Sequence, residues 1–467
     1  MLNRYIDFEL TFQPNNGGQI FFQAESETDG NRSGYLAASF PDDALRTLIT
    51  QLRADELDED GVTALGRQLF AALFLVDEVR GLFYRTQGAQ NEGVGIRLKL
   101  RTAPDDTVVS AVPWEYLYDP DRESPFVLQD ISVVRYPQAA AKIPNLETKL
   151  PLRVLLTAAQ PTDLPDALVD RELDAVLASL RERGLGVSQI EVIEERHLTR
   201  SRLQGLLRQR FHVWHFAGHG GFSRDNKNGV LFFEDKAGQR DAVSAPELRV
   251  LLANSGVRLI VLDACESGSA MMAPFRSIGP ALTASSVPAV VAMQFKVPEE
   301  STTAFAGEFY AALAEGHPID ACVTEGRKAV MGATGLRRPD WGIPVVYTRA
   351  PDGVLFKLPE TRGQGAGGGI NINAPGANIG GNFEVNQGNV NVGGITGASP
   401  AATGLPNNST FEREELEQLM KLKKRRLHQF KIQQATYGIN ADPSIIIQIE
   451  DLEREIQQME RDLATMQ

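Results

Sequence analysis

The sequence predicts an α/β protein built on a mostly parallel sheet that is flanked by helices. Short apolar strands alternate with helical segments over residues 149–360, and two of the strands lead into glycine-rich stretches. Strands separated by helices of this length form βαβ crossovers, which produce a buried parallel sheet. The predicted strands are 153–159, 190–193, 213–217, 259–262 and 289–294, and the predicted helices are 172–183, 199–210, 245–253, 302–315 and 318–331.

Residues 1–148 are predicted to form a mixed α/β region that precedes this sheet. Apolar and polar residues alternate over 6–12 and over 96–100, as they do on a strand with one buried face. Residues 62–84 carry apolar side chains at helical spacing. No group of residues in this region indicates catalytic chemistry by itself.

The segment 361–408 is rich in glycine and asparagine, and two interpretations of it stay open. Glycine-rich chains behave as flexible coils, so the segment can be a linker. Within 370–395, however, short stretches alternate apolar and polar residues between Gly-Gly or Asn-Gly punctuation. Such stretches can pair between chains, so a homo-oligomer formed through 370–395 is the alternative.

The last segment, 409–467, is predicted to be a helical hairpin. Residues 409–412 have the S-x-x-E spacing of a capping box, and apolar residues repeat as a heptad stripe over 445–466. The stripe can pack against the first helix of the same hairpin or dock onto the helices of a partner protein.

Composition excludes several classes of protein. Hydrophobic residues make up 42% and charged residues 23% of the 467 residues, which is typical of a globular chain. The net charge is 47 − 60 = −13, which argues against direct binding of nucleic acid or of an anionic membrane surface. No apolar run approaches the roughly 18 residues of a membrane span. The N-terminus lacks the apolar core of a signal peptide, and only two cysteines occur, so we expect a cytoplasmic protein.

Two motifs place reactive side chains at the ends of predicted strands. The stretches 213–221 and 259–269 are both apolar strands that we expect to run into small, glycine-rich loops. His219 follows the first strand and Cys265 follows the second. Because the carboxyl ends of parallel strands meet at one edge of a sheet, these two side chains can be neighbours in space.

A histidine beside a cysteine is an arrangement for nucleophilic catalysis. The imidazole of His219 can take the thiol proton of Cys265 and later protonate the leaving amine. The backbone N–H groups of Gly220 and Cys265 are candidate donors to the oxyanion of a tetrahedral intermediate. Glycines near such a site let the backbone of a substrate approach.

These residues also have interpretations other than catalysis. A cysteine after a strand is commonly a buried small hydrophobe. A metal site of His212, His215 and His219 is not expected, because no H-E-x-x-H or Cys-x-x-Cys motif completes it. We therefore expect neither a metal nor another cofactor. His215 is expected to pack or to orient the loop, and Cys322 is expected to be structural.

The paired motifs resemble those of the CHAT-domain peptidases, a caspase-like group of cysteine peptidases related to metacaspases, legumain and separase. The matching residues are His215–Gly220 and Asp263–Gly268, and the resemblance extends to Pro288–Gln294 and Pro113–Glu115. It covers roughly residues 80–358. In caspases the histidine lies about 50 residues before the cysteine; here the separation is 265 − 219 = 46.

The resemblance implies a caspase-like fold and a His–Cys dyad endopeptidase that cleaves protein substrates, with His219 and Cys265 as the dyad. It further implies that Asp263 binds a basic P1 side chain, although Asp263 can instead cap loop N–H groups. The segment 409–467 resembles helical effector-associated adaptors, which implies an activating or recruiting protein in a bacterial signalling or defence system. The alternative function is a catalytically silent scaffold that assembles complexes through its C-terminal segments.

Overall fold

The structure is a computed structural model. It describes residues 2, 4–13, 18–103, 106, 108–137, 147–164, 169–185, 188–223, 229–266, 275–285, 287–358, 424, 431 and 454. The predictions for 370–395 and, apart from three isolated positions, for 409–467 lie outside these residues. In the part that is described, no helix is both long and apolar enough to cross a membrane.

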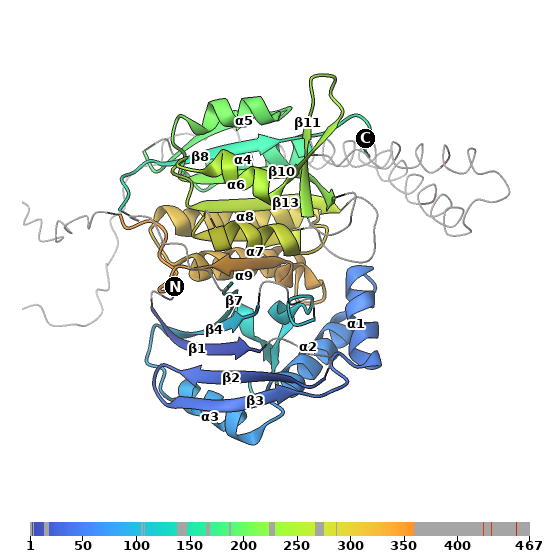
Figure 1. Ribbon diagram of the computed structural model, residues 1–467, viewed down its shortest axis with the longest axis vertical. Helices are drawn as coiled ribbons and strands as arrows, with labels where there is room; N and C mark the ends of the chain where they lie inside the picture. The colour runs from blue at the N-terminus through green and yellow to red at the C-terminus, as the bar shows by residue number, and fades with distance from the viewer. Residues whose placement is uncertain are drawn as a thin grey trace, which may run out of the picture. The chain divides into compact units, whose positions relative to one another are not determined.

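One large sheet of 13 strands organises the described part of the chain (Figure 1). Its main path runs β12-β11-β10-β13-β14-β15-β7-β4-β1-β2-β3, and β8 pairs with both β10 and β9. The strands are β1 Arg4–Phe12, β2 Ile20–Ser26, β3 Gly30–Leu36, β4 Val94–Arg101, β7 Ile131–Arg135, β8 Leu152–Ala158, β9 Ile190–Glu195, β10 Val213–Phe222, β11 Gly229–Glu234, β12 Arg240–Ser244, β13 Leu259–Glu266, β14 Ala289–Met293 and β15 Pro344–Thr348; β5 Tyr118–Asp119 and β6 Ser124–Pro125 form a separate pair.

The centre of the sheet is parallel, which confirms the predicted fold class. Strands β9, β8, β10, β13 and β14 run parallel to one another. Among the described strands of this sheet, antiparallel pairing is confined to the two hairpin regions, β1-β2-β3 and β10-β11-β12, and to the pair of β14 with β15. The strands of residues 1–148 join the same sheet, because β7 pairs with β15 through Arg135 and Tyr347.

Helices cover both faces of the sheet and divide the core into two clusters. Side chains alternate along the strands, so Val213 and Ala217 pack in the cluster that holds α4 and α8. Trp214 and Phe216 face the other way and pack with α5, α6 and α7. The helices are α1 Asp43–Arg53, α2 Glu59–Leu73, α3 Asp77–Gly88, α4 Val169–Glu182, α5 Arg200–Leu207, α6 Ala245–Leu252, α7 Phe275–Ser285, α8 Glu299–Ala314 and α9 Ile319–Thr334, with 3₁₀ turns η1 Trp114–Tyr116, η2 Phe126–Leu128 and η3 Pro339–Gly342.

The helical spacing over 62–84 falls on two helices in the structure. Helix α2 ends at Leu73 and α3 begins at Asp77. Asp77 and Glu78 stand in the first turn of α3, where carboxylates favour the positive end of the helix dipole. These acids support a new helix start that apolar spacing alone does not reveal.

A buried ion pair links the N-terminal strands to the end of the sheet-forming region. The Arg97 guanidinium on β4 donates from Nε to Asp320 Oδ2 at 2.6 Å and from Nη1 to Asp7 Oδ1 at 3.1 Å. Its other donors reach the carbonyl oxygens of Pro351 and Asp352. Because a buried charge is costly unless it is paired, this contact ties segments more than 200 residues apart in sequence.

Candidate active site

Strands β10 and β13 bring His219 and Cys265 to paired positions. The two strands are parallel, and their register matches Ala217 with Asp263, His219 with Cys265 and Gly220 with Glu266 (the strands are seen in Figure 1). Neighbouring strands in a sheet lie about 4.8 Å apart. The two residues singled out by the sequence are therefore adjacent at the carboxyl edge of the sheet.

The prediction that these residues lie in loops beyond the strands was wrong. Strand β10 continues through His219 to Phe222, and β13 continues through Cys265 to Glu266. The extension of β10 has a partner, because residues 219–222 pair antiparallel with β11, with His219 opposite Phe232. The His219 side chain is buried. Hydrogen-bonded strands hold both positions more rigidly than loops would.

Two glycines of β10 are required by packing at this edge. A Cβ on Gly218 would lie 2.7 Å from the Phe216 ring and 3.0 Å from the carbonyl oxygen of Ala159. A Cβ on Gly221 would lie 2.5 Å from the Phe232 ring. These glycines therefore let neighbouring groups of the same chain approach the strand. The sequence alone predicted instead that they let the backbone of a substrate approach.

Replacing Gly218 with alanine should lower the free energy of unfolding by about 1–3 kcal/mol, as overpacking in a core commonly does. Urea unfolding monitored by circular dichroism measures the change. Gly205→Ala is the matched control, since Gly205 is in helix α5 with no atom within 4 Å of an added Cβ. That control should be neutral or stabilising by up to about 1 kcal/mol. Equal effects of the two substitutions would contradict the packing argument.

His215 lies on the same strand and is held by a helix of the covering layer. Its Nδ1 is 2.8 Å from the hydroxyl of Tyr310 on α8, and the two rings are stacked. Burial lowers the pKa of His215 to about 4, so the imidazole is neutral at pH 7. His215 and His219 are four residues apart on β10, so their side chains lie on the same face of the sheet. The neutral, hydrogen-bonded ring of His215 therefore helps to fix the strand that carries His219.

Asp263 is buried on β13, two residues before Cys265. Burial raises the pKa of its carboxyl to about 7. The pKa of Tyr310 is raised by burial and, in second place, by the charge of Asp263, so the hydroxyl and the carboxyl are electrostatic neighbours. A carboxyl with a pKa near neutrality changes its charge within the physiological range.

A buried polar cluster at the end of β14 brings together two motifs that lie far apart in the sequence. Gln294, directly after β14, donates from Nε2 to the Gly342 carbonyl at 2.8 Å and to Glu115 Oε2 at 3.3 Å. Glu115 accepts two hydrogen bonds from Arg135, at 3.0 and 2.8 Å. Sequence reasoning missed Arg135, because nothing in its local pattern shows that it faces Glu115.

The remaining candidate residues have structural surroundings. Cys322 is buried in α9, and burial raises the pKa of its thiol well above the ordinary value, so it stays protonated. His212 accepts a hydrogen bond at Nδ1 from the backbone N–H of Arg153, at 2.9 Å. In the described residues, no group of three or more His, Cys, Asp or Glu side chains could hold a metal ion.

The sheet and its covering helices define an α/β protein in which the candidate residues His219 and Cys265 lie on two adjacent parallel strands. The CHAT-domain family model matches residues 63–348, which is more than half of the chain. The chain belongs to the CHAT-domain family. A comparison with curated proteins found no match.

Solved structures with distant similarity include two groups of proteins. The Arg-specific cysteine proteinase gingipain R is 12% identical, and the match covers 68% of this chain and 76% of that one, with a TM-score of 0.39. The complex of the Porphyromonas gingivalis RgpB pro- and mature domains matches at 10% identity over 68% and 78%, also with 0.39. The Saccharomyces cerevisiae separase–securin complex matches at 10% identity over 74% and 30%, with 0.42. At these TM-scores the similarity carries no functional argument.

Proposed function

We propose that the chain is a cysteine endopeptidase that cleaves protein substrates with a dyad of His219 and Cys265. The observation that carries the proposal is the pairing of these two residues on adjacent parallel strands at the carboxyl edge of the sheet. Membership of the CHAT-domain family adds support. Paired strands supply the fixed geometry that nucleophile and base need.

The proposed reaction has two steps. His219 takes the thiol proton of Cys265, and the thiolate attacks the carbonyl carbon of the scissile peptide bond. The tetrahedral intermediate collapses when the imidazolium protonates the leaving amine, which leaves an acyl group on the sulfur. Water, deprotonated by the imidazole, then hydrolyses this thioester and releases the new carboxyl terminus.

The proposed oxyanion donors are the backbone N–H groups of Gly220 and Cys265. Such donors stabilise the charge that develops on the carbonyl oxygen. Gly220 pairs in register with Leu231 on one side and with Glu266 on the other. A strand with partners on both sides commits most of its N–H groups to the ladder, so the Gly220 N–H would have to be released from the ladder to act as an oxyanion donor.

Asp263 is the proposed partner of a basic P1 side chain, and its burial gives this proposal a pH dependence. With a pKa of about 7, the carboxyl is mostly neutral at pH 6 and mostly charged at pH 8. Only the charged form attracts a guanidinium strongly. The preference for P1 arginine over its neutral isostere citrulline, as a ratio of kcat/KM values, should therefore rise with pH across this range.

Asp263→Asn should make this ratio low and independent of pH. Ionisation of the dyad acts on both substrates equally, so it cancels from the ratio. Paired fluorogenic peptides that differ only at P1 measure the ratio for both forms of the protein. A preference for arginine that does not change with pH, or that persists in Asp263→Asn, would make Asp263 a structural residue.

The experiment that tests the function itself compares newly formed N-terminal peptides in cells that express the chain or its Cys265→Ala variant. Peptides that appear only with the unchanged chain identify both cleavage and the P1 residue. A peptide electrophile should alkylate Cys265 and spare Cys322, whose pKa is raised by burial. Identical peptide sets, or alkylation of Cys322 alone, would overturn the proposal.

A further inference from the structure

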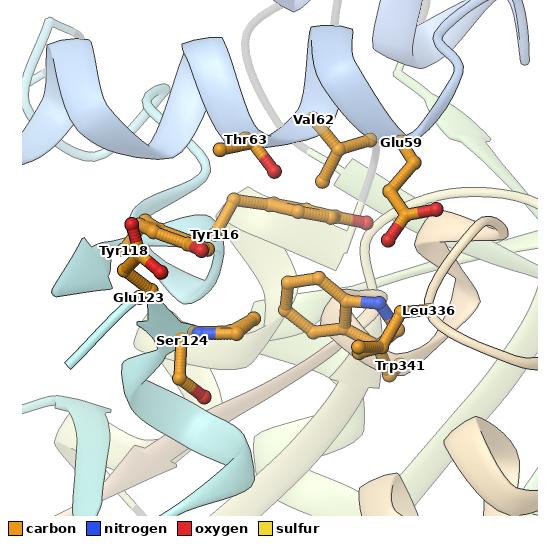
Figure 2. Close-up of a pocket in the computed structure, with 10 residues that line it drawn as sticks. Glu59, Val62, Thr63, Tyr116, Tyr118, Glu123, Ser124, Leu336 and Trp341 are labelled. Atoms are coloured by element: carbon orange, nitrogen blue, oxygen red, sulfur yellow. The ribbon is translucent and has the colours of Figure 1, made fainter. Parts of the chain in front are cut away.

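A small cavity of about 150 Å³ lies between α2, the segment 116–125 and η3 (Figure 2). None of the residues proposed for peptide hydrolysis lines it. A cavity of this size accommodates one planar group about as large as benzene. It is smaller than the roughly 300–1,000 Å³ pockets that enclose drug-sized ligands. Its dimensions suit a single side chain.

The floor of the cavity is aromatic and rigid. The rings of Tyr116 and Trp341, which are only 1% and 2% exposed, lie 5.2 Å apart between centroids. The Tyr116 hydroxyl donates to the Pro339 carbonyl at 2.8 Å. Two glycines allow this packing, because a Cβ on Gly66 or Gly342 would lie 2.4 Å from an atom of Tyr116. The aromatic surface is therefore formed before any ligand arrives.

The rim of the cavity carries two carboxylates that are weakly engaged. The side chains of Glu59 and Glu123 are 52% and 78% exposed, and their cations Arg337 and Arg67 stand at 3.8 and 4.0 Å. Ion pairs this exposed and this long contribute little. The Arg67 guanidinium also lies over the Tyr118 ring, 5.4 Å from its centroid. An aromatic ring of the cavity lining therefore already stacks against a guanidinium of the same chain.

Trp341 is a second, independent observation that indicates a ligand. Its Nε1 is buried and finds no acceptor among the residues that the structure describes. Figure 2 shows the nitrogen edge of the indole on the side of the cavity where Glu59 and Leu336 lie. A buried donor without an acceptor is unfavourable, because it has lost its hydrogen bond to water without gaining another. A ligand that brings a carbonyl close to a cation would satisfy this donor as well as the carboxylates.

We propose that this cavity binds the arginine side chain of a polypeptide. A guanidinium is planar and stacks on aromatic faces, so it fits the tyrosine and tryptophan floor. Its positive charge is favoured by the two glutamates, which lie at opposite ends of the cavity (Figure 2). The peptide backbone supplies the carbonyl for Trp341. The proposal does not depend on peptidase activity, because no residue of the dyad takes part.

Tryptophan fluorescence of the full chain, titrated with the peptide Gly-Arg-Gly, tests the proposal. Three tryptophans are present, and Trp341→Phe assigns the signal to the cavity, since Trp114 and Trp214 stay in place. Calorimetry on the same samples detects binding that does not change the fluorescence. The peptide Gly-citrulline-Gly, which has the same shape but no charge, should bind about tenfold more weakly or not at all.

Charge variants at the rim sharpen the test in both directions. Glu59→Gln with Glu123→Gln should weaken binding of Gly-Arg-Gly about tenfold, since loss of two partly exposed charges that each favour the ligand by about 0.7 kcal/mol gives that factor. Arg67→Gln with Arg337→Gln should strengthen binding several-fold, because these side chains compete for the same carboxylates. Asp60→Asn is the matched control: it removes one charge from the same turn of α2, does not line the cavity, and should change nothing.

Binding should also weaken with added salt, and it should persist in Asp263→Asn, which separates this cavity from the proposed P1 pocket. The proposal is overturned if Gly-Arg-Gly gives no saturable signal by either method. Equal binding of the citrulline peptide, or binding unaffected by the paired glutamine substitutions, overturns it as well. Loss of binding in Asp263→Asn alone would assign the peptide to the P1 pocket.

Discussion

Cys265→Ala and His219→Ala should each reduce kcat/KM for peptide hydrolysis by at least about 10⁴-fold, and the double variant should be little worse than either one. The reason is that the two residues act as a unit in the proposed mechanism. Without the imidazole the thiol keeps its proton, and without the thiol the imidazole has no nucleophile to activate. The in-register pairing places the two positions side by side, as this proposed cooperation requires.

Steady-state hydrolysis of a fluorogenic peptide found by N-terminal profiling measures this effect. Cys322→Ala and His317→Ala are the matched controls, because they make the same chemical changes on α9 and just before it, away from β10 and β13. Both should keep nearly full activity. Unfolding in urea shows that the inactive variants are folded. If Cys265→Ala keeps more than about one hundredth of the activity of the unchanged chain, Cys265 is not the nucleophile.

Much of the sheet and the neighbourhood of the pair could be predicted from the sequence. Short, mostly apolar runs at 213–217 and 259–262 indicate buried strands, and the parallel topology places their carboxyl ends on one edge. Where the strands end could not be predicted. The glycines after Phe216 suggest a loop, but residues 219–222 stay extended because β11 pairs with them, and that partner is a tertiary feature.

The surroundings of Asp263 show the same limit. Its position before Cys265 is visible in the sequence, but its burial and its proximity to Tyr310 depend on how α8 packs over the sheet. Tyr310 stands 310 − 263 = 47 residues further along the chain, and local spacing carries no information about such a contact. The hydrogen bond between Tyr310 and His215 was missed for the same reason.

The contact between Glu115 and Arg135 leads to the second large prediction. Glu115→Ala should lower the free energy of unfolding by about 3–5 kcal/mol, because it leaves the buried Arg135 guanidinium without a counter-charge. Both side chains are buried, at 0% and 7% exposure. Arg135 would keep its hydrogen bonds to the carbonyls of Ser110 and Val112, but carbonyls do not neutralise its charge.

Urea unfolding compares this variant with Glu9→Ala, which breaks the Glu9–Arg101 ion pair between β1 and β4. Both side chains of that pair are about one quarter exposed, so the free energy of unfolding should fall by only about 1 kcal/mol. If the two variants unfold at the same urea concentration, burial of the Glu115 pair is not what stabilises this part of the fold.

The double variant Glu115→Ala with Arg135→Met distinguishes an uncompensated charge from a simple cavity. Removing both charges should recover part of the stability lost in Glu115→Ala, so the two substitutions should be non-additive by 1 kcal/mol or more, about the range seen for contacting residues. Gln294 directly follows β14, which pairs with β13. It loses Glu115 as a hydrogen-bond acceptor in either variant. Peptide hydrolysis should therefore fall in Glu115→Ala before global unfolding, even though Glu115 takes no part in the chemistry. Additive losses in stability would show that the pair acts only by filling space.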